Sequence, residues 1–163
     1  IICVFCKYFL YFSMDLQNIS ISFILNEKSS SVYCVDVSDT VAEAVGLMNR
    51  ESIGSVMVIK NGQYVGIFTE RDVLNRVISA KLNPEKTRVE KVMTSDFISV
   101  QENSTLRQTM HIMTNKRVRH LPVFEEEKLV GMISIGDVTR KLLEINQNEA
   151  ASLRQYLFTE YSG

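Results

Sequence analysis

The feature that most constrains the fold of this chain is an internal repeat. A shift of 65 positions places residues 31–73 over residues 96–138 without a gap. Hydrophobic patterning alone can align apolar positions, but it cannot match glycine with glycine and aspartate with aspartate. Identical pairs include Val35/Val100, Thr40/Thr105, Met48/Met113, Gly66/Gly131 and Asp72/Asp137. The chain therefore contains two copies of one structural unit.

The same order of elements is predicted in both copies. A short strand leads to a helix that opens with a capping box, Thr40-x-x-Glu43 in the first copy and Thr105-x-x-Gln108 in the second. Two apolar strands and a closing helix follow. The predicted strands are 32–35, 55–59 and 64–69, then 97–100, 121–124 and 129–134, with closing helices over 72–80 and from 137 towards 157. Short lead-in helices are predicted near 21–25 and 89–93.

Each copy thus has the order β-α-β-β-α, which predicts an α+β fold. One unit of about 50 residues cannot bury both faces of its sheet, but two units can pack sheet against sheet about a pseudo-two-fold axis. We assign residues 1–18 to an apolar leader and 19–80 to the first repeat. Residues 81–88 form the linker, and 89–163 form the second repeat with an extended C-terminal helix.

Charge and hydropathy exclude two classes of partner. The chain has 18 Lys+Arg and 19 Asp+Glu, a formal net charge of -1, which argues against binding nucleic acid through the overall field. Residues 1–14 are almost wholly apolar, yet a bilayer-spanning helix needs about 20 residues. We interpret this leader as a mis-called start or a remnant of a targeting segment, and we predict no membrane association.

The motifs of metal sites and enzymes are missing from the sequence. Cys3-x-x-Cys6 has the spacing of a metal or redox site, but no second CxxC and no histidine pair accompany it. The sequence also contains no P-loop, GxSxG, HExxH or well-spaced Cys/His pair. We therefore predict no metal and no catalysis.

The strand-to-helix junctions carry the chemistry that the repeats share. Thr69-x-x-Asp72 and Ser134-x-x-Asp137 each fit a capping box that ends a strand and opens a helix. The same groups suit a nucleotide: a hydroxyl can donate to a phosphate oxygen, and a carboxylate can accept from two ribose hydroxyls. A helix N-terminus also favours a phosphate. Capping and ligand binding are compatible readings of these residues.

Three segments give the chain a family resemblance: GIFTERD over 66–72, GMISIGD over 131–137, and RVRHLPV over 117–123. The pattern resembles a tandem pair of CBS domains, also called a Bateman module. It is similar in particular to small stand-alone CBS-pair proteins of plant organelles and bacteria. The resemblance implies a regulatory protein that binds an adenosine-containing ligand: AMP first, with ADP, ATP or S-adenosylmethionine as alternatives. It also implies a homodimer, regulation of a partner enzyme such as thioredoxin, and a mitochondrial or other organellar location, with the cytoplasm as the alternative.

The candidate ligand-binding residues follow from the motifs and from the resemblance. They are Thr69, Arg71, Asp72, Arg119, His120, Pro122, Ser134 and Asp137. The second repeat carries Arg119-His120 where the first has Gly54-Ser55. Because a guanidinium suits a phosphate, we expect the second repeat to bind phosphorylated ligands better.

Two other functions remain open from the sequence. The chain could be an interaction scaffold with empty clefts, or an enzyme whose motifs differ from those sought. A ligand-dependent rise in melting temperature separates a binding protein from a scaffold.

Overall fold

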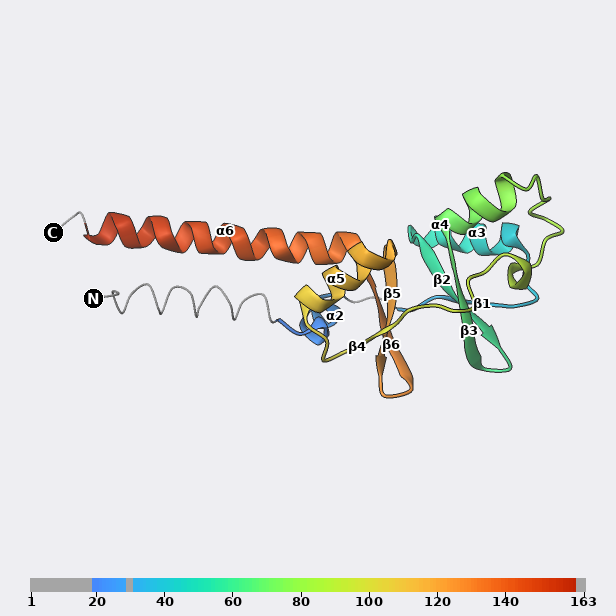
Figure 1. Ribbon diagram of the computed structural model, residues 1–163, viewed down its shortest axis with the longest axis horizontal. Helices are drawn as coiled ribbons and strands as arrows, with labels where there is room; N and C mark the ends of the chain where they lie inside the picture. The colour runs from blue at the N-terminus through green and yellow to red at the C-terminus, as the bar shows by residue number, and fades with distance from the viewer. Residues whose placement is uncertain (1–18, 29–30, 161–163) are drawn as a thin grey trace. The chain divides into compact units, whose positions relative to one another are not determined.

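The computed structural model describes residues 19–28 and 31–160, with side chains through Gln147 (Figure 1). Its contacts divide the chain into two compact units. We call residues 31–99 the first-repeat unit, and residues 19–28 with 100–160 the second-repeat unit. Each holds a three-stranded sheet and helices, so the α+β prediction is confirmed. The apolar leader with Cys3 and Cys6 lies outside the described residues.

The sheet of the first-repeat unit contains β1 (Cys34–Asp36), β2 (Ser55–Lys60) and β3 (Gln63–Thr69) in that order. Strand β1 runs parallel to β2, and β2 runs antiparallel to β3. The turn between β2 and β3 has positive φ at both Asn61 and Gly62, the conformation that an Asn-Gly hairpin favours.

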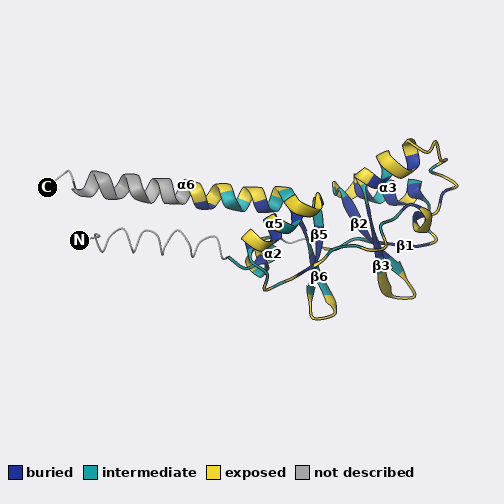
Figure 2. Ribbon diagram, in the orientation of Figure 1, coloured by how far each residue is buried: buried dark blue, intermediate teal, exposed yellow. Residues whose placement is uncertain are grey.

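Helix α3 (Val41–Glu51) covers the first sheet because its apolar stripe matches the sheet face. It opens with the predicted capping box, in which Thr40 and Glu43 bond each other's backbone N–H. Its buried residues Val41, Ala44 and Met48 join the core that also holds Val56 and Phe68. Figure 2 shows the buried residues concentrated along β2.

The closing helix of the first repeat differs in detail from the prediction. A short α4 (Glu70–Asp72) continues into the π-helix η1 (Val73–Ile78). The Ser79 N–H accordingly bonds the Leu74 carbonyl five residues back, at 3.1 Å. Apolar spacing predicts that a helix exists here, but it does not distinguish an i→i+5 from an i→i+4 bonding pattern.

The second-repeat unit has the same topology. Its sheet contains β4 (Val100–Gln101), β5 (His120–Glu125) and β6 (Lys128–Ser134), covered by α5 (Leu106–Lys116). His120 pairs with Ser134 as Ser55 pairs with Thr69 in the first sheet. The closing helix α6 (Ile135–Glu160) is much longer than its counterpart.

Helix α2 (Ile21–Glu27) precedes the first repeat in sequence but packs on the second. The Ile21 N–H bonds the Ser104 carbonyl at 2.9 Å, and the Leu106 N–H bonds the Ile19 carbonyl at 2.8 Å. Ile21 and Ile24 are buried there. The sequence assigned residues 19–28 to the first repeat. In the structure they belong to the second-repeat unit, because that unit covers their apolar face.

A corresponding segment completes the first-repeat unit. The 3-10 helix η2 (Val89–Lys91) follows the linker, and Thr94 then forms a two-hydrogen-bond bridge with Ile67 of β3. The repeated glycines allow these close approaches. A Cβ on Gly66 would lie 3.0 Å from the Thr94 carbonyl oxygen, and one on Gly131 would lie 2.6 Å from Leu25 Cδ2.

Candidate functional site

The first repeat places Thr69 and Asp72 at the corner between β3 and α4. Asp72 Oδ2 accepts from the Thr69 N–H at 2.9 Å and from the Thr69 hydroxyl at 2.7 Å. Its other oxygen, Oδ1, accepts from the Thr94 hydroxyl at 3.3 Å and lies 3.4 Å from the Arg76 guanidinium. Asp72 is buried. Its carboxylate is held by groups from the end of β3, from Thr94 and from η1.

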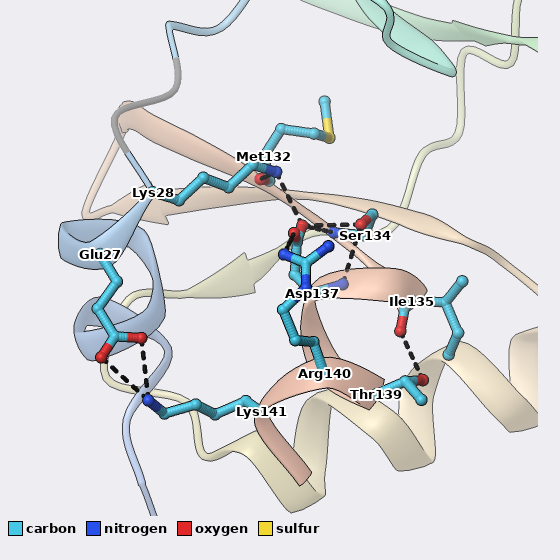
Figure 3. A network of polar contacts seen from close by, with 9 residues as sticks. All are labelled: Glu27, Lys28, Met132, Ser134, Ile135, Asp137, Thr139, Arg140 and Lys141. Carbon is cyan, nitrogen blue, oxygen red and sulfur yellow. Dashed lines mark hydrogen bonds and ion pairs between the residues drawn. The ribbon is translucent and has the colours of Figure 1, made fainter. Parts of the chain in front are cut away.

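The second repeat builds the same corner between β6 and α6 with a different neighbour (Figure 3). Asp137 Oδ2 accepts from the Ser134 N–H at 2.8 Å and from the Ser134 hydroxyl at 2.7 Å. The Lys28 ammonium, from the end of α2, donates to the same oxygen at 2.8 Å. Oδ1 faces Arg140, whose guanidinium lies 3.9 Å away, beyond hydrogen-bond distance.

These contacts determine the charge of the second corner. Burial raises the pKa of the Asp137 carboxyl, but the hydrogen bonds from Lys28 and from the Ser134 N–H and hydroxyl outweigh that effect. The net pKa of Asp137 is lowered, so the carboxylate is ionised at neutral pH and able to accept from ribose hydroxyls.

The strand entry of the second repeat lies at this same corner. The Arg119 carbonyl accepts from the Ile135 N–H at 2.8 Å, and His120 sits opposite Ser134 in the sheet register. The Arg119 side chain is exposed, His120 is half-buried, and Pro122 is buried inside β5. Five of the predicted site residues therefore lie in the second-repeat unit, where β5 begins and where β6 passes into α6. They are Arg119, His120, Pro122, Ser134 and Asp137.

The remaining predicted residues, Thr69, Arg71 and Asp72, share the corner of the first repeat. The Glu70 N–H bonds the Gly54 carbonyl at 3.1 Å, which ties this corner to its own strand entry in the same way. Arg71 lies on α4 next to Asp72 and is exposed.

Sequence reasoning missed three polar residues of these corners: Lys28, Arg76 and Thr94. Arg76 had a readable signal, because a cation four residues after Asp72 on a helix lies on the same face. Thr94 and Lys28 had none, since Lys28 is 109 positions from Asp137 in the sequence.

A pocket of about 300 Å³ opens beside Asp137, lined by Ile24 and by charged side chains of α2 and α6. That volume is at the lower end for small-molecule sites, about 300–1,000 Å³. Lys141 of α6 joins the two helices through an ion pair with Glu27 of α2 at 2.9 Å. It also pairs with Glu144 of its own helix at 3.1 Å. Among the side chains that the structure describes, in residues 19–28 and 31–147, no cluster of three His, Cys, Asp or Glu could hold a metal ion.

The family model of the CBS domain matches residues 28–79 and 89–144. This chain belongs to the CBS-domain family. CBS-domain proteins are generally regulatory modules without catalysis of their own, and no enzymatic family is indicated.

Relatives and solved structures agree with that assignment. "CBS domain-containing protein CBSX3, mitochondrial" of Arabidopsis thaliana is 32% identical over 151 residues, which cover 86% of this chain and 73% of the relative. A putative signal-transduction protein with CBS domains from Burkholderia ambifaria has a TM-score of 0.75 at 34% identity, covering 77% of this chain and 95% of that one.

A more distant CBS pair shares the fold. The CBS domain pair of protein MJ0100 has a TM-score of 0.66 at 19% identity, covering 75% of this chain and 94% of that one. It was solved in complex with 5′-methylthioadenosine and S-adenosyl-L-methionine. In the part of our chain that the structure describes, no helix is both long and apolar enough to cross a bilayer.

Proposed function

We propose that this CBS pair is a non-catalytic regulatory module that binds adenosine-containing ligands, AMP first, at the Asp72 and Asp137 corners. The observation that carries the proposal is the repetition of one polar corner in both units. In each, a hydroxyl residue ends a strand and a nearly buried aspartate opens a helix. The adenosine ligands of the MJ0100 pair support the same chemistry.

Each residue has a distinct role in this proposal. Asp72 and Asp137 accept from ribose hydroxyls, and Thr69 and Ser134 donate to the ligand or fix the carboxylate. Arg119, His120 and Arg71 are the groups expected to meet a phosphate. Pro122 is buried in β5 and holds the strand that presents Arg119 and His120.

The partner and the location are also part of the proposal. Thioredoxin is the first regulated enzyme to test, following the family resemblance of the sequence. A mitochondrial location is supported by the name of the Arabidopsis relative. A homodimer is supported by exposed apolar side chains on η1, Leu74 and Ile78, which are 62% and 58% exposed.

Calorimetry with AMP, ADP, ATP, S-adenosylmethionine and adenosine tests the ligand. Asp137→Asn keeps one acceptor for the Ser134 N–H, so it removes the charge with little loss of the helix cap. We expect Asp137→Asn and Asp72→Asn each to weaken binding at their own corner by about tenfold or more, as expected for lost hydrogen bonds to a charged group.

Arg119→Ala is the matched test of the phosphate contact. It should lower the affinity for AMP by about tenfold and leave the affinity for adenosine unchanged, since only AMP has the phosphate. If none of these ligands binds or raises the melting temperature of the wild-type chain, the protein is a scaffold with empty corners and the proposal is wrong.

A further inference from the structure

Lys28 is held in a fixed position beside Asp137, although it is a lysine on the surface. It caps the C-terminus of α2, where its N–H bonds the carbonyls of Ile24 and Leu25, both at 3.1 Å. Helix α2 is in turn attached to the second repeat by buried Ile21 and by the Glu27–Lys141 ion pair. Because the Lys28 backbone is already fixed, the contact between its ammonium and Asp137 costs little further backbone entropy.

The ammonium occupies one of the two carboxylate oxygens that a ribose diol could bond. It donates to Asp137 Oδ2 at 2.8 Å and lies 3.4 Å from the Met132 carbonyl, as Figure 3 shows. Oδ2 already accepts from the Ser134 N–H and hydroxyl. Three donors therefore already crowd this oxygen, which offers about two lone-pair directions. A ribose that bonds one hydroxyl to each carboxylate oxygen must displace a donor from Oδ2, and Lys28 is the one of the three that is not part of the Ser134 cap.

The first repeat has no such cation from its lead-in segment. There the corresponding segment supplies the Thr94 hydroxyl, a neutral group 3.3 Å from Asp72 Oδ1. The cation at that corner, Arg76, comes from the closing helix and also bonds the carbonyls of Val92 and Met93. The two corners thus differ in which group a ligand has to displace.

We infer that Lys28 is a specificity-determining residue of the Asp137 corner, which makes that corner favour phosphorylated adenosine ligands over uncharged ones. An uncharged nucleoside takes the carboxylate from Lys28 and offers the ammonium only neutral acceptors in return. A nucleotide offers its phosphate as a new partner, and the flexible four-carbon stem of lysine lets the ammonium move to it. The side chain is 36% exposed, so this movement is sterically open.

This inference rests on the proposed function. It predicts that replacing Lys28 changes the affinities for AMP and for adenosine in opposite directions. In the Asp72→Asn background, where the heat reports the second corner, AMP and adenosine are titrated into Lys28 and Lys28→Met chains. We expect Lys28→Met to bind adenosine about two- to fivefold more tightly, because a competing ion pair is gone. AMP should bind about tenfold more weakly, because a hydrogen bond to its charge is gone.

Two further variants separate the role of Lys28 from general charge effects. Lys28→Arg keeps a cation at the same place and should retain the preference for AMP. Lys128→Met removes an exposed lysine at the far end of the β5–β6 hairpin and should leave the AMP-to-adenosine ratio unchanged. The ratio therefore reports the position of the charge and not the net charge of the protein.

A readout without ligand tests the ion pair itself. Carboxyl carbon NMR should show a higher Asp137 pKa in Lys28→Met than in the wild-type chain, and an unchanged pKa would overturn the inference. It is equally overturned if both ligands bind and Lys28→Met leaves their ratio unchanged, while the proposed function stands. If neither ligand binds the wild-type chain, the proposed function fails and the inference falls with it.

Discussion

At the scale of single residues, Asp72 and Asp137 have the same backbone role in different electrostatic surroundings. Each closes a capping box at the start of its helix. Only Asp137 has an ammonium on the capping oxygen, from Lys28, with the Arg140 guanidinium near the other oxygen. The sequence predicted both aspartates, but not this difference between them.

The lowered pKa of Asp137 predicts how stability depends on pH. Because the folded-state pKa lies below the ordinary aspartate value of about 3.9, the unfolded chain binds the proton first as the pH falls. The stabilisation is fully present above the unfolded pKa and is lost as the pH falls through the folded one. We expect Asp137→Asn to cost about 1–2 kcal/mol at neutral pH, because the Lys28 ammonium loses its charged acceptor. This difference should shrink between about pH 5 and about pH 3.

Urea unfolding of the wild type and Asp137→Asn across this pH range measures the effect. Asp96→Asn, at an exposed residue, carries the same change of net charge and serves as the control. A difference between wild type and Asp137→Asn that stays constant down to pH 3 would show that the carboxylate is not stabilised by its partners.

At the scale of elements, the sequence predicted what local chemistry determines. The two capping boxes and the Asn-Gly turn are read from adjacent residues, and all three are present in the structure. The matched Gly66 and Gly131 were evidence of a repeat, and the structure supplies their reason: a lead-in segment passes too close for a side chain. Which segment passes which glycine was not predictable, because apolar periodicity does not say which sheet covers an apolar face.

The packing of α2 on the second repeat gives a prediction of its own. Ile21 is fully buried, so Ile21→Ala should lower the free energy of unfolding by about 2–4 kcal/mol. Asn26→Ala, at an exposed position of the same helix, should change it by less than about 0.5 kcal/mol. Equal effects of the two variants in urea unfolding would mean that α2 does not contribute to the core.

At the scale of the whole molecule, the exposed apolar surface of η1 predicts the association of two copies. Leu74 and Ile78 are four residues apart and more than half exposed, so they form one apolar face. We expect Leu74→Glu with Ile78→Glu to convert a homodimer into a monomer in sedimentation equilibrium, because burying two carboxylates in an interface is unfavourable.

Tyr64→Glu, on β3 near the hairpin turn, is the control and should leave the dimer intact. The stability of each folded chain should change little, since the replaced side chains contact solvent. A wild-type chain that sediments as a monomer at all accessible concentrations would remove the homodimer from the proposal.

The order in which the ribosome makes the chain follows from the place of α2. The first-repeat unit is a continuous stretch and has all its parts once residue 99 has left the exit tunnel. Helix α2 is made before it, yet its partners Ser104 and Leu106 are made after it, and Asp137 later still. At about 5–20 residues per second, α2 waits on the order of ten seconds with Ile21 and Ile24 uncovered. During synthesis this uncovered segment is therefore open to capture by a chaperone or by α5 of a neighbouring chain on the same messenger.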